Sequence, residues 1–200
     1  MKFVKRICPL VVVILILGGC KSKESASKQG LELNRQGTEL LASNPEKALS
    51  KFLEAEELNP ETPEYKANAG IAYMTLNRNE EALQKFKETI QLDPKYLQAY
   101  YNQGVILENL GNHEDAIKSY KTALQIAPDS PEIVYNLALA YEKSGQDKEA
   151  AENYSRFIVI APQSLQPAIE EAKSRLKRLQ VTKDEKPNEK RKTAKRKRKR

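Results

Sequence analysis

Apolar, small and aromatic residues recur along this chain with a period of 34 residues. In each of four copies an alanine is followed four positions later by an aromatic residue, and a proline comes eight positions after that aromatic residue. These residues are Ala48, Ala82, Ala116 and Ala150; Phe52, Phe86, Tyr120 and Tyr154; and Pro60, Pro94, Pro128 and Pro162. Because the apolar positions of each copy also follow helical spacing in two consecutive stretches, the pattern predicts four pairs of antiparallel helices.

Each predicted pair has small residues where its two helices must approach each other. Gly70, Gly104 and Ala138 mark this position in the first helix of copies two to four, opposite the alanine of the second helix. Residues that tolerate the left-handed conformation of a helix stop follow at Asn77, Gly111 and Gly145. One such pair is too small to bury its own apolar side, so we expect consecutive pairs to stack.

The first copy departs from the strict period. A spacing of 34 residues would place Gln36 and Glu39 at the small and aromatic inner positions. A turn at 43–45 that is one residue shorter places Gly37 and Leu40 there instead, and its asparagine and proline suit the start of the next helix. We adopt this shorter turn.

A last amphipathic helix is predicted at 165–181, after the fourth copy. Its apolar residues at helical spacing are Leu165, Ile169, Ala172, Leu176 and Leu179. The opposite face is charged, which is what a terminal capping helix requires.

The combination of alanine, aromatic and proline positions resembles the tetratricopeptide-repeat family over residues 30–180. The tryptophan often found at the fourth position of that family's repeats is replaced by Lys66, Tyr100 and Val134, while the other marks stay in phase. The resemblance implies an all-α solenoid of four helix-turn-helix repeats, at 30–62, 63–96, 97–130 and 131–164, plus the C-terminal capping helix at 165–181.

The resemblance also implies a binding groove, because the first helices of such repeats line the concave side of the solenoid. The side chains at the groove positions are Asn68, Ile71, Met74, Tyr101, Asn102, Val105, Glu108, Tyr135, Asn136, Leu139 and Glu142. The three asparagines would align amides able to hold the backbone of an extended peptide. Alternatively they serve hydrogen bonds within the fold, and the sequence does not decide between the two. Tyrosine and aliphatic side chains add apolar surface, and the carboxylates favour a basic peptide.

The cations of the family's carboxylate clamp, which grips acidic chaperone tails, are missing from this groove. Glu64, Gln98 and Glu132 occupy its second position. We therefore do not expect a tail of that kind to bind.

The N-terminus has the three zones of an export signal. Lys2, Lys5 and Arg6 precede an apolar run from Ile7 to Leu17, which two glycines separate from Cys20. The 14 residues from Ile7 to Cys20 are fewer than the ~20 that a membrane-spanning helix needs. An export signal is therefore favoured over a spanning helix.

The tetrapeptide Leu17-Gly18-Gly19-Cys20 resembles the lipobox of bacterial lipoproteins. This implies a signal peptide at 1–19, acylation of Cys20 with palmitate-like chains, and a polar tether at 20–29. It also implies a place in the bacterial cell envelope, and Lys21 favours the outer membrane because it is not the aspartate linked to inner-membrane retention. The alternative is that Cys20 follows an ordinary signal peptide or a short anchor by chance.

The net charge of +7 comes from the two ends of the chain. Residues 183–200 hold eleven Lys or Arg against three Asp or Glu, whereas the body is mildly acidic. We expect the tail at 182–200 to be disordered by self-repulsion and to bind an anionic surface such as phospholipid, lipopolysaccharide or wall polymer. Nucleic acid is a poorer partner, because no aromatic residues alternate with the cations.

Candidate chemistry is sparse. His113 is the one histidine, the chain has two cysteines, and there is no glycine-rich phosphate loop. We expect no enzyme activity, no cofactor and no metal. Two functions remain: a membrane-anchored scaffold that binds a protein or peptide in the groove, or a structural tether that holds the membrane to an anionic polymer through the tail.

Overall fold

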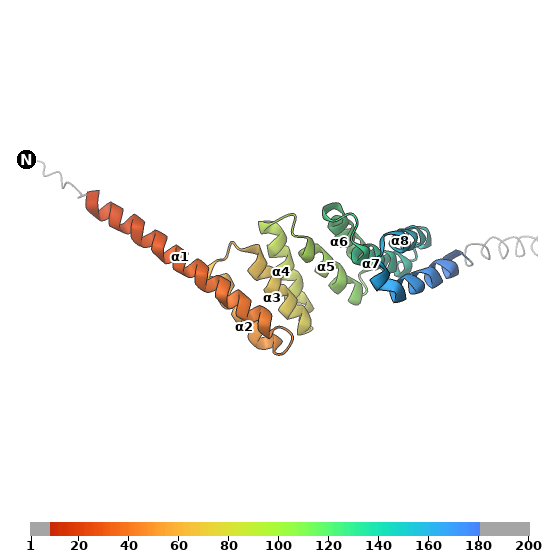
Figure 1. Cartoon of the computed structure of the whole chain (residues 1–200), viewed down its shortest axis with the longest axis horizontal. Helices are drawn as coiled ribbons and strands as arrows, with labels where there is room; N and C mark the ends of the chain where they lie inside the picture. The colour runs from red at the N-terminus through yellow and green to blue at the C-terminus, as the bar shows by residue number, and fades with distance from the viewer. Residues whose placement is uncertain (1–8, 181–200) are drawn as a thin grey trace, which may run out of the picture. The chain divides into compact units, whose positions relative to one another are not determined.

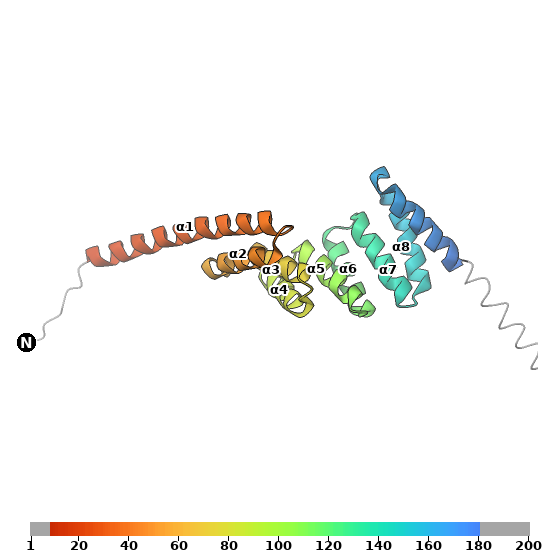
Figure 2. The same ribbon diagram turned by 90° about the horizontal axis from the view of Figure 1, so that it is seen from below.

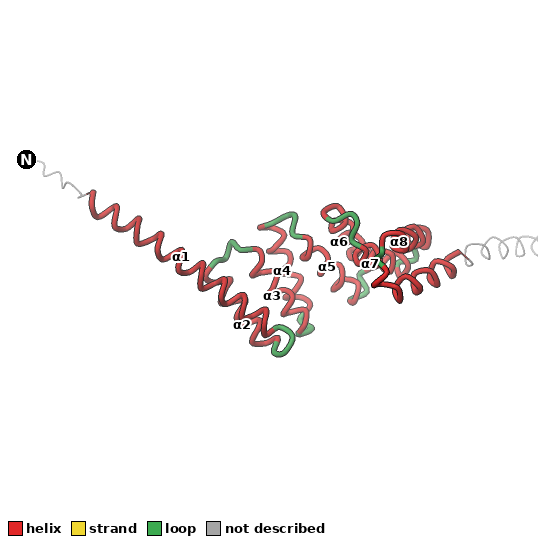
Figure 3. Tube along the Cα trace, in the orientation of Figure 1, coloured by secondary structure: helices red, strands yellow, loops and turns green. Residues whose placement is uncertain are grey.

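The computed structural model describes residues 9–180, with side chains from residue 24 onward, and this part of the chain is helical without strands. Its elements, shown in Figures 1, 2 and 3, are α1 (Pro9–Leu40), α2 (Pro45–Leu58), α3 (Pro63–Thr75), α4 (Asn79–Leu92), α5 (Leu97–Asn109), α6 (His113–Ile126), α7 (Pro131–Lys143), α8 (Asp147–Ile160), a 3-10 turn η1 (Gln163–Leu165) and a helix at 166–180. The prediction of an all-α chain of four helix pairs with a capping helix is confirmed.

The helices form two compact units, which divide between Pro94 and Lys95. In unit 1, α1 packs against α2, α2 against α3 and α3 against α4, and α1 also touches α3. In unit 2, α5 to α8 repeat this arrangement, with α5 touching α7. The helix at 166–180, called the C-terminal helix below, packs its buried Ile169 and Ala172 into the core of unit 2.

The turns between the paired helices close as the sequence predicts. Asn77, Gly111 and Gly145 all have a positive φ, between 59° and 77°. After α3, the backbone N–H of Arg78 donates to the carbonyl of Tyr73 at 2.9 Å and that of Asn77 to the carbonyl of Met74 at 3.0 Å, and the other two turns repeat these bonds. This Schellman arrangement satisfies the last carbonyls of the helix and reverses the chain within a few residues.

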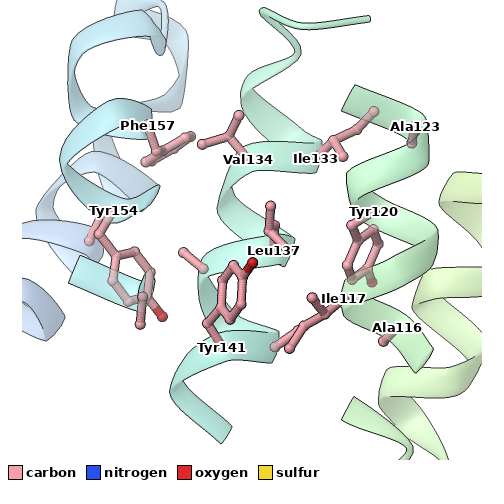
Figure 4. Close-up of a cluster of buried hydrophobic side chains, with 14 of the residues drawn as sticks. Ala116, Ile117, Tyr120, Ala123, Ile133, Val134, Leu137, Tyr141, Tyr154 and Phe157 are labelled. Atoms are coloured by element: carbon pink, nitrogen blue, oxygen red, sulfur yellow. The ribbon is translucent and has the colours of Figure 1, made fainter. Parts of the chain in front are cut away.

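Close approach of the two helices in a pair depends on residues without a bulky side chain. A Cβ added at Gly104 would lie 2.4 Å from the Cε1 of Tyr120, and one at Gly70 would lie 2.8 Å from the Cε1 of Phe86. The aromatic rings of the 34-residue pattern, which include Tyr120, therefore fill the space directly over these glycines. Figure 4 shows Tyr120, Tyr141, Tyr154 and their aliphatic neighbours in the core of unit 2.

The shorter first turn is confirmed. A Cβ at Gly37 would lie 2.5 Å from the Cε1 of Phe52, so Gly37 holds the small position that strict counting assigns to Gln36. Asn44 caps α2 by accepting a hydrogen bond from the backbone N–H of Lys47 at 3.0 Å, and a proline opens the helix.

Residues 20–29, the expected polar tether, are helical and continuous with the rest of α1. This segment has no proline and little apolar surface, and Glu24 and Lys28 pair one helical turn apart at 2.8 Å, which supports helix. Among the described residues, no helix combines the length and the apolar character that crossing a membrane requires. The expected disordered tail at 182–200 and residues 1–8 of the expected signal peptide lie outside the described residues.

An ion cluster fills the space around the fourth position of the second repeat, where Lys66 replaces the family's tryptophan. Glu56 of α2 lies 2.6 Å from the Nζ of Lys66 and 2.7 Å from the Nζ of Lys85, and Glu88 lies 3.6 Å and 3.4 Å from the same atoms. The four side chains are 13–28% exposed, so solvent screens the charges only in part. The cluster joins α2, α3 and α4.

We expect Glu56→Gln to lower the free energy of unfolding of unit 1 by about 3 kcal/mol, because it leaves Lys66 and Lys85 largely buried with only the more distant Glu88. Urea unfolding of the full chain, followed by circular dichroism, measures the change. Glu54→Gln is the matched control, since Glu54 pairs with Lys51 on the same helix where the side chains are 44% and 32% exposed, and it should matter by less than about 0.5 kcal/mol. Equal effects of the two substitutions would contradict a structural role for the cluster.

Candidate functional site

The eleven predicted groove residues all lie on α3, α5 and α7, the first helices of repeats two to four. Asn68, Ile71 and Met74 belong to unit 1, and the other eight belong to unit 2. All are partly exposed except Asn102, which is 5% exposed. Apart from Asn102, the predicted positions therefore reach the surface in each unit.

The amide of Asn68 is used within unit 1. Its Nδ2 donates to the Oδ1 of Asn34 at 2.8 Å, and the Nδ2 of Asn34 donates to a carboxylate oxygen of Glu64 at 2.9 Å. These bonds join α1 to α3, and Asn34 is 5% exposed. Asn34 is absent from the predicted groove. It lies 34 residues before Asn68, and this repeat spacing could have assigned it to the groove.

The amide of Asn136 is also bonded inside its own unit. Its Nδ2 donates to the hydroxyl of Tyr101 at 3.1 Å, which joins α7 to α5. The sequence left open whether these asparagines hold a peptide or form hydrogen bonds within the fold. At Asn68 and Asn136 the structure shows hydrogen bonds within the fold. A peptide clamp would have to use the second N–H or the carbonyl oxygen of each amide.

Two of the predicted groove carboxylates are already paired. Glu108 is 10% exposed and lies 2.6 Å from the Nζ of Lys143 and 3.0 Å from the Nδ1 of His113. His113 is the first residue of α6, directly after the turn that follows α5. Glu108 therefore joins α5 to α6 and α7. The sequence suggested that its charge would attract a basic ligand, but Lys143 and His113 already occupy the carboxylate.

Glu142 is engaged by the C-terminal helix. Its carboxylate accepts a hydrogen bond from the hydroxyl of Tyr154 at 2.6 Å and lies 3.0 Å from Arg175 and 3.4 Å from Arg178. Three donors of unit 2 therefore already surround this carboxylate.

The two predicted groove tyrosines are held by their neighbours. The ring centroid of Tyr101 is 6.2 Å from that of Tyr120, and the centroid of Tyr135 is 4.9 Å from that of Phe157. Burial, together with a hydrogen bond to Glu171 of the C-terminal helix, raises the pKa of Tyr135 to about 12. The C-terminal helix thus lies over α7 at Tyr135 and Glu142.

An open hollow of about 360 Å³ remains between the first turns of α5 and α7. Its lining consists of Leu97, Gln98, Tyr101, Ser130, Glu132 and Ile133. Of these only Tyr101 is among the eleven predicted residues, although Gln98 and Glu132 are named in the sequence analysis as groove positions without cations. Within unit 2, this hollow offers apolar surface beside polar groups, which suits a ligand side chain.

Comparison with family models identifies the repeats. Models described as tetratricopeptide repeat match residues 39–96, 68–131 and 110–176, which together span more than half of the chain. The repeats are tetratricopeptide repeats. No curated protein matches the chain.

Solved structures show the same tetratricopeptide fold. A crystal structure of MamA is 22% identical, with a TM-score of 0.64 over 71% of this chain and 84% of that one. MamA 41-end from Desulfovibrio magneticus RS-1 is 19% identical, with a TM-score of 0.64 over 78% and 96%. The first TPR of Spaghetti (RPAP3), bound to the HSP90 peptide SRMEEVD, is 22% identical, with a TM-score of 0.58 over 60% and 95%. At these identities the likeness concerns the fold.

Tetratricopeptide repeats are a family of protein-interaction scaffolds without enzymatic chemistry of their own. Within the part of the chain that has described side chains, no group of three or more His, Cys, Asp or Glu residues could hold a metal ion. Because repeats of this family generally mediate protein–protein interaction, the sites that this fold offers are surfaces for protein partners.

Proposed function

We propose that this tetratricopeptide protein is a lipid-anchored scaffold of the bacterial cell envelope that binds a peptide or protein partner on the inner surface of its first helices. The observation that carries the proposal is the open hollow between α5 and α7, with apolar walls and few polar groups. The peptide bound to the tetratricopeptide domain of Spaghetti, which has this fold, supports it further.

The anchoring part of the proposal rests on the sequence. The charged, apolar and small-residue zones that end at Cys20 support export and acylation. Such a chain would present its groove to partners at the membrane surface, as expected for a component of a secretion or envelope-assembly machine. The outer membrane is favoured over the inner one, on the identity of Lys21.

A second candidate function is a tether to an anionic polymer, and the eleven cations of residues 183–200 favour it. Electrostatic adhesion of this kind is screened by salt, because the Debye length falls from about 10 Å at 0.1 M to about 3 Å at 1 M. Binding in an apolar hollow is less sensitive to salt. Salt dependence therefore separates the two functions.

Selection of a random peptide library on the immobilised full chain, in 0.5 M salt, tests the scaffold. We expect enriched peptides that bind equally well after deletion of 183–200 and at least about tenfold more weakly to Gln98→Arg, because an arginine from this exposed position fills the hollow. Gln125→Arg is the matched control, with the same charge change on an exposed residue of α6. If no peptide depends on Gln98 and polymer binding disappears with the tail, the tether is the function.

A further inference from the structure

The hollow between α5 and α7 has an apolar floor and a single charged group. Ile133 is 3% exposed, and Leu97 and Tyr101 pack against the core of unit 2. Gln98, Ser130 and Glu132 supply the polar atoms, and no Lys or Arg is among the lining residues. The volume of about 360 Å³ is near the lower end of the ~300–1,000 Å³ of ligand pockets, which suits one or two side chains of a peptide.

Glu132 differs from the other carboxylates of this surface. Its side chain is exposed at the start of α7 and accepts a hydrogen bond from the hydroxyl of Ser130 at 3.2 Å. No residue that the structure describes forms an ion pair with it, whereas Glu108 and Glu142 are held by cations of their own unit. Glu132 is therefore the carboxylate of the hollow that can accept a cation from outside.

The wall formed by Tyr101 is fixed in place before any ligand binds. Its hydroxyl accepts a hydrogen bond from Asn136, and its ring is tilted by 49° against that of Tyr120. These contacts already restrict the rotation of the Tyr101 side chain. A ligand that packs against the ring therefore costs little additional conformational entropy. A tyrosine face also attracts cations, which adds to the effect of Glu132.

We propose that the hollow binds an extended peptide in which a lysine or arginine adjoins an aliphatic residue, with the cation at Glu132 and the aliphatic side chain between Leu97, Tyr101 and Ile133. This inference rests on the proposed scaffold function and names its partner class. It also predicts discrimination against acidic peptides, because a carboxylate placed beside Glu132 would be repelled with no cation in the lining to compensate.

Fluorescence anisotropy of the full chain with two labelled peptides tests the inference. The basic peptide GSLKILRGS is compared with its charge-reversed form GSLEILEGS in 0.15 M salt, with circular dichroism to verify that each variant is folded. We expect Glu132→Gln to weaken binding of the basic peptide about threefold to fivefold, and Glu132→Lys to weaken it about tenfold or more.

Glu152→Lys is the matched control, since it changes the net charge equally from an exposed position on α8. Because all variants share the same cationic tail, acidic peptide bound by the tail contributes equally to each of them. Equal effects of Glu132→Lys and Glu152→Lys on the basic peptide would overturn the inference. Library peptides that depend on Gln98 but carry no cation would also overturn it, while leaving the scaffold function in place, whereas a library without Gln98-dependent peptides would remove both.

Discussion

Replacing Tyr154 with alanine is expected to lower the free energy of unfolding of unit 2 by about 4 kcal/mol. The side chain is fully buried, its ring meets that of Tyr135 nearly edge-on with centroids 5.9 Å apart, and its hydroxyl donates to Glu142. Alanine would leave a cavity in the core and remove one donor from a carboxylate that is 22% exposed. Since a domain is stable by about 5–15 kcal/mol, a loss of this size is readily measured by urea unfolding.

Two further substitutions show which part of Tyr154 matters. Tyr154→Phe keeps the ring and removes the hydrogen bond to a charged acceptor, so it should cost about 1.5–2 kcal/mol. The ring itself suits phenylalanine, because Phe52 and Phe86 stand at the equivalent position of the first two repeats. Val159→Ala, on the same helix and 83% exposed, should change stability by less than about 0.5 kcal/mol. A loss for Tyr154→Ala no larger than that for Val159→Ala would contradict the packing.

The fold could be predicted because its signals are local and repeated. Gly70 and Gly104 must be small since an aromatic ring of the same repeat lies against them, and in both repeats that ring is 16 residues later. In the first repeat the need for a small residue overrides the spacing, because Gly37, 15 residues before Phe52, can accept its ring and Gln36 cannot. Short-range constraints of this kind leave few alternatives for stacking helix pairs.

The site was harder to predict because its chemistry depends on pairings between helices. A carboxylate is free to bind a ligand only if no long basic side chain from another helix reaches it. Glu142 pairs with Arg175 of the C-terminal helix, and Glu108 pairs with Lys143 of α7. Glu132 has a position equivalent to that of Glu64, yet only Glu64 accepts a hydrogen bond from an asparagine of a neighbouring helix. Sequence periodicity assigns these residues to a surface but does not determine which partners reach them.

Asn34 shows a second reason why sequence periodicity could not determine the site. The register that correctly assigns Gly37 to the α1–α2 contact moves the sixth position of the first repeat to Arg35, whereas the α1–α3 contact selects Asn34. Two neighbours of one helix thus follow registers that differ by one residue. A single counting scheme could satisfy only one of them.

Replacing Cys20 with serine is expected to release the chain from the membrane when the full sequence is expressed in bacterial cells. The proposed anchor includes a diacylglycerol group joined to the sulfur of Cys20 by a thioether, and serine has no sulfur with which to form this bond. Stable anchoring requires two lipid signals or more, because one acyl chain binds a bilayer only reversibly, with a constant of about 10⁴ M⁻¹. We therefore expect incorporation of an alkynyl palmitate label to disappear and the carbonate-resistant membrane fraction to fall about tenfold or more.

The second cysteine supplies a matched control for this experiment. Cys8 lies inside the apolar run of the expected signal peptide, so Cys8→Ser should leave both the label and the membrane fraction unchanged. If Cys20→Ser keeps its membrane fraction but loses the label, the apolar run at 7–17 itself holds the chain, since an uncleaved signal remains a hydrophobic anchor. If Cys20→Ser keeps the label as well, Cys20 is not the acylated residue. Loss of the label in Cys20→Ser, with Cys8→Ser unaffected, agrees with acylation at Cys20, and loss of the membrane fraction as well shows that the lipid is what holds the chain.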